Sequence, residues 1–197
     1  MATYRAIKAT CEAVVELLKQ SWHEDMFTSE ILSFEVYNSD SFTDLTVTVG
    51  VTLFLYRVEI NATQRSLPAP PSPTGQPRRR QLPLDLHFVL IPWADEPDEQ
   101  QEILGWMMRA IEDNPVLPSS FLNANAPGTF ADNEVVELIF GQLTNEELFR
   151  IWDSLPVDFH LSVPYVARVV RIDSDLDLTG GGPVLTRELD FGELEDA

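Results

Sequence analysis

Residues Leu82–Asn114 constrain the fold of this chain more than any other stretch, because a strand pattern is followed there directly by a helix pattern. Apolar residues alternate along Leu84–Ile91, which predicts a central strand with one wholly apolar face, ended by Pro92. Pro97 suits a first helical turn, and apolar residues then recur at helical spacing until Asn114. The sequence therefore predicts one strand and one helix packed face to face as the centre of the core.

The same two patterns predict four further strands and two further helices. The strands are Ile31–Tyr37, Asp44–Ile60, Asn133–Phe140 and His160–Ile172, and the helices are Thr3–Trp22 and a segment that a capping box at Thr144–Glu147 begins and Pro156 ends. The apolar parity changes near Phe54–Tyr56, which indicates either a bulge or burial of both faces there. Pro164 favours an edge position for the last strand, or a bulge near its start. We therefore expect an α+β fold: a mixed, mostly antiparallel sheet of about five strands packed with about three helices.

The domain organisation follows from two stretches that cannot form core elements. Residues 62–81 are rich in proline and contain Arg78, Arg79 and Arg80, so they predict an exposed loop between two strands. Residues 175–197 contain a Gly-Gly-Gly-Pro joint and many acids, which predicts a flexible C-terminal arm. The prediction is one domain over residues 1–174 followed by this arm. Residues Val116–Asp132 are interpreted as a loop, and the helix at Thr3–Trp22 either covers the sheet or packs on a copy of itself.

Charge and composition exclude several classes of partner. The net charge of −19 disfavours nucleic acids and anionic membrane surfaces, since both are polyanions. No apolar run is long enough to span a bilayer, and the first residues have no signal-peptide pattern. The single cysteine, Cys11, lies on the apolar stripe of the first helix, which predicts a buried thiol in a protein of a reducing compartment.

No pattern of residues predicts a catalytic, cofactor or metal site. The three histidines, His23, His87 and His160, are far apart, and His87 alternates with core residues, which favours a structural role in a sheet. Three aspartates that begin at Asp173 resemble the start of a calcium loop but lack its glycine and its final glutamate. We predict a protein that is not an enzyme and binds no cofactor, while an unrecognised carboxylate pair remains the enzymatic alternative.

Five segments together resemble one protein family in their order and spacing, from about residue 10 to residue 174. They are LFLYRVEIN (Leu53–Asn61), PLDLHFVLIPWA (Pro83–Ala94), ILGWMMRAIEDNPVL (Ile103–Leu117), LTNEELFRIWDSLP (Leu143–Pro156) and LSVPYVARVVRIDS (Leu161–Ser174). In this respect the chain is similar to the cap, or tail-terminator, proteins of phage-tail-like extracellular contractile injection systems of the antifeeding-prophage and virulence-cassette type.

The resemblance implies a structural role. Such proteins form a six-fold ring on the last layer of the inner tube, end its growth and engage the last layer of sheath. It thus implies a homo-oligomer, a hexameric ring, with the tube protein and the sheath protein as partners. It also implies assembly in the bacterial cytoplasm and a place in the injection particle, which is either released on lysis or anchored in its cell. Some members of the family continue into a further domain, where this chain has only the short acidic arm.

Two hypotheses about contacts follow from the arms. In a head-to-tail ring, Arg78, Arg79 and Arg80 meet the acidic arm of a neighbouring subunit. Leu185, Leu189 and Phe191 share one parity, so residues 184–191 add as a strand to a sheath or neighbour sheet edge. The alternative function is an acidic, non-enzymatic adaptor that links other components without forming a ring.

Overall fold

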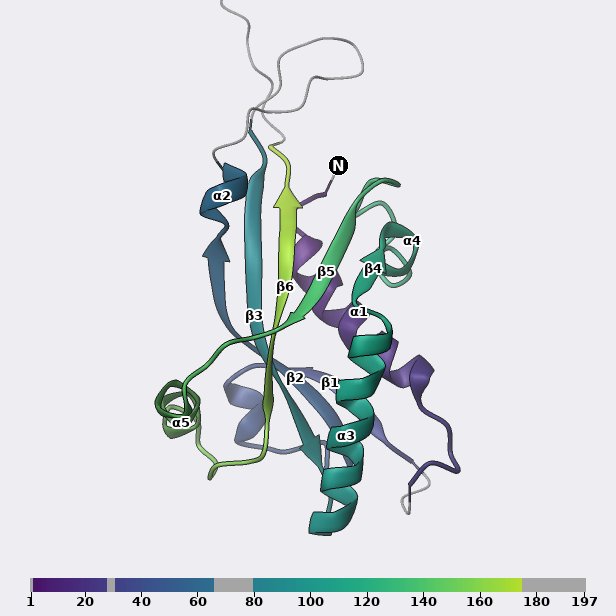
Figure 1. Ribbon diagram of the computed structural model, residues 1–197, viewed down its shortest axis with the longest axis vertical. Coiled ribbons are helices and arrows are strands. Elements are labelled where there is room, and N and C mark those ends of the chain that lie inside the picture. Colours follow the sequence, from purple (N-terminus) through teal and green to yellow (C-terminus); the bar gives the residue numbers. More distant parts are fainter. Residues whose placement is uncertain (1, 28–30, 66–79, 175–197) are drawn as a thin grey trace, which may run out of the picture.

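Six strands pair in the order β1-β2-β3-β6-β5-β4 in the computed structural model, which describes residues 2–27, 31–65 and 80–174 (Figure 1). The strands are β1 (Ser33–Tyr37), β2 (Gly50–Ile60), β3 (Leu82–Trp93), β4 (Val116–Pro118), β5 (Val135–Phe140) and β6 (Val163–Ile172). The helices are α1 (Ala6–Ser21), α2 (Ala62–Arg65), α3 (Pro97–Asp113), α4 (Ser119–Leu122) and α5 (Asn145–Asp153), with a 3-10 helix η1 (Asp40–Phe42). Among the strands of the described residues, only β1 and β2 pair in parallel. The expected α+β class with a mostly antiparallel sheet is confirmed, with one more strand than expected and with α1, α3 and α5 as the main helices.

The predicted central strand is confirmed, because β3 lies between β2 and β6. Its alternating residues separate two apolar clusters. Leu86, Phe88 and their same-parity neighbours pack below α1 and α3, on what we call the α1/α3 face. Val89 and Ile91 belong to a second cluster on the opposite side, the α5 face. Both faces of β3 are therefore covered over much of its length, and the other elements pack around this strand.

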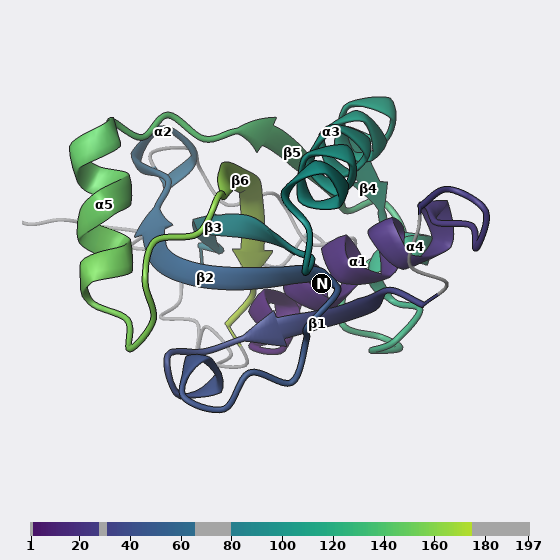
Figure 2. The ribbon, with the colours of Figure 1, turned by 90° about the horizontal axis from the view of Figure 1, so that it is seen from below.

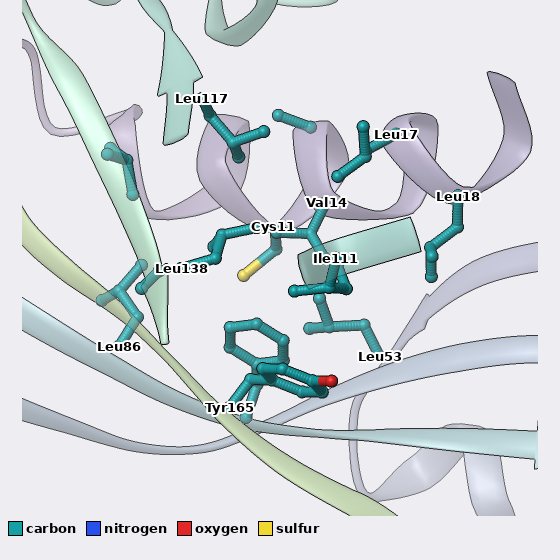
Figure 3. Packing of buried hydrophobic residues seen from close by; sticks show 14 of the residues in the cluster. Cys11, Val14, Leu17, Leu18, Leu53, Leu86, Ile111, Leu117, Leu138 and Tyr165 are labelled. Atoms are coloured by element: carbon teal, nitrogen blue, oxygen red, sulfur yellow. The ribbon is translucent and has the colours of Figure 1, made fainter. Parts of the chain in front are cut away.

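The larger cluster forms the interface between the sheet and the long helices. Cys11, Val14 and Leu18 of α1 are buried against the sheet, where Leu53 and Leu86 lie below them (Figure 3). Side chains from α3, β4, β5 and β6 complete the cluster, as the labelled Ile111, Leu117, Leu138 and Tyr165 show (Figure 3). The helix at the start of the chain therefore covers the sheet, which was the first of its two interpretations.

The α5 face is covered by shorter elements. The predicted capping box is present, since the Thr144 hydroxyl accepts from the Glu147 N–H and the Glu147 carboxylate accepts from the Thr144 N–H. This cap orients α5 so that Trp152 is buried, with its Nε1 donating to Ser162 Oγ at 3.1 Å. The Trp152 ring also lies 6.0 Å from that of Phe42 in η1. Figure 2 shows α5 on one side of the strands, with α1 and α3 on the other.

Two predictions based on proline are wrong, for one physical reason. Pro92 does not end its strand, because it still pairs with Val51 and β3 continues to Trp93. β6 is an interior strand despite Pro164. Pro92 lies beyond Leu90, the last residue of β3 that pairs with β6. Pro164 lies beyond Tyr165, the last residue of β6 that pairs with β5. The Pro92 carbonyl accepts from the Gln100 side chain instead, and the Pro164 carbonyl accepts from Gly141 N, just past β5. A missing N–H costs little where the ladder has already ended.

Other differences involve the ends of elements. β2 begins at Gly50 rather than at Asp44, because residues 38–49 form η1 and a loop that the Tyr37 hydroxyl holds by accepting from the N–H of Val47. The residues Val116–Asp132, interpreted as a loop, contain the three-residue β4 and the four-residue α4. The parity change near Phe54–Tyr56 is a bulge, since the β2–β3 register shifts between Leu55 and Arg57.

A second irregularity, between β3 and β6, divides the sheet into two parts. Leu84 pairs with Val170 and Leu86 pairs with Ala167, so two β6 residues lie opposite Asp85. One of them, Val169, has φ 62°, an unusual conformation for a β-branched residue. Beyond it β5 no longer pairs with β6, and Ala2 occupies the space, with its carbonyl accepting from Asp173 N. Beyond the bulge, the upper end of β6 is therefore bonded to the start of the chain instead of to β5.

Candidate interaction surfaces

The two predicted arms leave the sheet at the same end. Leu82 pairs with Ile172, and Gln81 Nε2 donates to Asp173 Oδ1 at 3.0 Å, so the residues that follow one arm and precede the other lie side by side at the top of Figure 1. Of the predicted interaction residues, Arg80 is described and its side chain is exposed. The others, Arg78, Arg79, Leu185, Leu189 and Phe191, lie outside the described residues. The structure therefore places the origins of both arms together.

The outer edge of β2 is open along its upper half. β1 pairs with β2 only as far as the Tyr37–Phe54 pair, so among the described residues no strand pairs with Tyr56–Ile60 on the side away from β3. In Figure 1 this part of β2 lies at the left-hand border of the sheet. Unpaired N–H and C=O groups along such an edge are a template for another strand.

Exposed apolar side chains accompany this open edge. Val58 and Ile60 are 43% and 45% exposed, and Leu82 on the adjacent β3 is 41% exposed. All three lie on the α1/α3 face, because Val58 pairs with Leu86 and Ile60 pairs with Leu84. The sequence indicated this parity, but it held no signal that the neighbouring strand β1 would end at Tyr37, opposite Phe54, and leave these side chains in solvent.

A second exposed apolar surface lies on α5. Phe149 of α5 and Phe159 are each about half exposed, and their rings contact edge to face with centroids 5.2 Å apart. Trp152 lies behind them and packs on Phe159 at 6.0 Å. Large exposed aromatic side chains in contact with one another are typical of protein interfaces. The sequence pattern did not indicate this surface, since Phe149 lies next to the buried stripe of its helix.

A surface groove of about 450 Å³ lies between α1 and β1. Its walls carry Lys8, Glu12, Glu16 and Glu35, and its floor includes Phe34. The carboxylates have ordinary partners: Lys8 contacts Glu12 at 3.5 Å, and the Thr46 hydroxyl donates to Glu35 at 2.9 Å. The groove is thus a solvated acidic surface with an apolar floor, and its groups are not arranged as an acid–base pair.

The titratable side chains inside the fold have structural partners. His87 Nε2 lies 3.1 Å from a Glu59 carboxylate oxygen on the α5 face, as expected for a sheet-face histidine. Desolvation lowers the pKa of His160, which packs on the indole of Trp93 at 4.5 Å. Within residues 2–27, 31–65 and 80–174, no group of three or more His, Cys, Asp or Glu side chains is placed to hold a metal ion. No helix among the described residues is both long and apolar enough to span a bilayer.

The Cys11 thiol is expected to resist labelling in the folded protein. Burial, helped by the nearby Glu12 carboxylate, raises the pKa of this thiol from 9.0 to about 12. At pH 8 the thiolate fraction is then about a thousandfold lower than in the unfolded chain. An aromatic disulfide reagent should therefore react at least about a hundredfold more slowly with the native protein than in 6 M guanidinium.

The same pKa shift predicts a pH dependence of stability. Above pH 9 the unfolded chain loses the thiol proton while the folded chain retains it, so the Cys11 contribution to the free energy of unfolding falls as pH rises towards 12. Urea denaturation between pH 8 and pH 10.5 should show a smaller loss in C11A than in the parent chain. Rapid labelling of the native protein, or equal losses in both chains, would contradict burial of this thiol beneath α1.

Comparisons with known proteins identify relatives of the whole fold. A family model described as the Pvc16 N-terminal domain matches residues 9–186. The sheath/tube terminator of the PVC extracellular contractile injection system, in its extended state, is similar with a TM-score of 0.62 and 15% identity, covering 100% of this chain and 66% of that chain. The tube-terminating cap of the anti-feeding prophage has a TM-score of 0.58 and 16% identity, covering 91% of this chain and 59% of that one.

This chain therefore spans less than two thirds of the length of either solved terminator. No curated protein sequence matches it significantly. At 15% and 16% identity the likeness to these two proteins shows the fold alone, whereas the family model matches the sequence of most of this chain.

Proposed function

The chain belongs to the Pvc16 N-terminal domain family, and from this premise we propose that it terminates the inner tube of a contractile injection particle. The observation that carries the proposal is the agreement of two independent likenesses over nearly the whole chain. The family model covers residues 9–186, and the two solved proteins compared above are described as tube terminators. The resemblance found in the sequence is thereby confirmed at the level of the family.

We further propose that the subunits form a hexameric ring on the last tube layer and that this ring engages the last sheath layer. A ring subunit needs two different surfaces, because head-to-tail contacts join unlike patches of neighbouring copies. The Phe149–Phe159 surface and the open edge of β2 are two exposed apolar surfaces of different shape. They support the proposal as candidates for contacts with a neighbour, with the tube or with the sheath. Assembly would take place in the bacterial cytoplasm.

Within the ring, Arg78, Arg79 and Arg80 are proposed to contact the acidic arm of the next subunit. These residues supply three of the 13 cationic side chains in a chain with a net charge of −19. The opposite charges of Arg78, Arg79 and Arg80 and of the many acids in residues 175–197 support this pairing. Complementary charge of this kind fixes the orientation of neighbours more than it adds affinity.

Ring assembly can be tested by light scattering of the purified protein at several concentrations, with and without its tube protein. A species of hexamer mass that is promoted by the tube is expected. In the variant R78E/R79E/R80E, half-assembly should require at least about ten times more protein, a change that corresponds to about 1.4 kcal/mol.

The matched control is R5E/K8E/K19E, which makes the same change in net charge on exposed positions of α1 and its N-cap. The control is expected to assemble like the parent chain. Equal effects in both triple variants would assign the loss to net charge and would disprove the specific contact. A protein that keeps the mass of a monomer both with and without the tube protein would instead favour the acidic adaptor.

A further inference from the structure

We propose that the open edge of β2, Tyr56–Ile60, binds residues 184–191 of the same molecule as an added antiparallel strand. This inference is independent of the terminator role, because it involves only the chain itself. It assigns an occupant to a surface that the fold leaves unpaired, and it assigns a binding site to Leu185 and Leu189.

The edge is kept accessible by the elements around it. The bulge between Leu55 and Arg57 lies just after the last residue that pairs with β1, so the strand continues alone. The short helix α2, which follows β2, is held over the α5 face rather than over the edge. Asn61 Nδ2 donates to Asp85 at 2.9 Å, and the Gln64 side chain accepts from Arg171 at 3.4 Å.

An open edge beside exposed apolar side chains is a liability for a soluble protein. Val58 and Ile60 lie directly on the edge strand, and an unrelated strand that paired there would bury them. Proteins usually protect such edges with charges, with proline, or with a covering segment. β2 has a covering segment over its lower half, namely β1, and none among the described residues over its upper half.

The apolar residues within 184–191 match the apolar face of this edge. Leu185, Leu189 and Phe191 share one parity and match the apolar side of β2, where Val58 and Ile60 lie. Because a strand presents alternate residues to opposite faces, the register that places Leu185 and Leu189 beside Val58 and Ile60 places Glu188 and Asp190 on the opposite face, where Arg57 and Glu59 pair with each other.

Chain length and direction also agree with this placement. An added strand beyond β2 would lie three strand spacings from β6, or about 14 Å. The nine residues 175–183, which follow Ser174, span up to about 30 Å. β2 and β6 both run antiparallel to β3, so a chain that leaves the end of β6 and turns back runs antiparallel to β2. A short linker within one molecule gives a high effective concentration, which favours the segment of the same chain over that of a neighbour.

Disulfide trapping in the full chain tests the proposal. V58C is combined in turn with L185C and with L189C, which share the apolar parity, and in control variants with T186C and with E188C, which have the opposite parity. The native Cys11 is buried and leaves the introduced pair as the reactive thiols. We expect at least a tenfold higher yield of cross-linked monomer for one of the same-parity pairs than for either control.

Hydrogen exchange provides a second readout without new cysteines. In L185D/L189D the amides of residues 56–60 should exchange at least tenfold faster than in the parent chain, whereas V184D/T186D, with the same added charge, should change their exchange rates much less.

In the disulfide experiment, cross-linked dimers or a ladder of oligomers would overturn docking within one molecule and assign the segment to a neighbouring copy. Equal yields for both parities, or unchanged exchange in L185D/L189D, would overturn docking at this edge.

Discussion

Replacing Gly50 with alanine is expected to lower the free energy of unfolding by at least about 3 kcal/mol, which corresponds to about 6 °C or more in Tm for a domain of this size. Gly50 has φ 145°, a conformation that L side chains rarely adopt. A Cβ atom there would lie 2.0 Å from the carbonyl oxygen of Ser33, so β1 would have to move away from β2. Thermal unfolding followed by circular dichroism measures the loss.

Tryptophan fluorescence locates this effect. Phe34 of β1 lies between Trp22 and Trp106, with ring centroids 6.4 and 6.1 Å away, so displacement of β1 should change the emission of the native state. The matched control is G105A in the exposed middle of α3, where an added Cβ has no neighbour within 4 Å. Alanine should stabilise that helix by up to about 1 kcal/mol. Equal stability of G50A and the parent chain would show that the β1–β2 contact is looser than the structure describes.

Removing the carboxylate of Asp85 is expected to cost about 2 to 3 kcal/mol. One carboxylate oxygen accepts from the backbone N–H of Val169 at 3.0 Å, and the other accepts from Asn61 Nδ2 at 2.9 Å. D85A leaves both donors inside the sheet without this acceptor and removes the interaction that holds Val169 at positive φ. Urea denaturation of D85A measures the cost.

A double-mutant cycle separates the bulge from ordinary burial. Glycine adopts positive φ without strain, so D85A should cost less in a V169G background than in the parent chain. We expect a coupling energy of at least about 0.5 kcal/mol. Additive effects of D85A and V169G would mean that the carboxylate stabilises the strands without holding the bulge.

The sequence predicted those elements whose own side chains determine them. The alternation in β3 and the helical spacing in α3 each specify which face is buried, and the capping box places the start of α5 at one residue. These signals are local and strong, so the structure and the sequence agree there.

The sequence could not predict features that depend on which strands become neighbours. Pro92 and Pro164 are tolerated because adjacent ladders end beside them, and Val58 is exposed because β1 ends at Tyr37. The three residues of β4 are too few for any periodicity, and they form a strand through their pairing with β5. The open edge of β2 therefore required the structure, whereas the apolar parity of residues 184–191 was evident from the sequence.

The position of β6 has a consequence for how the chain folds. β6 is the last strand in sequence but lies in the interior of the sheet, between β3 and β5. Until residues 163–172 have been synthesised and have paired, β1, β2 and β3 cannot join β4 and β5 in one sheet. The edges of β3 and β5 that β6 will cover face solvent until then. Contacts such as that of Asp173 with Ala2 also have the largest sequence separation in the described chain. We expect slow, highly cooperative folding that is completed only after the end of β6 has left the ribosome.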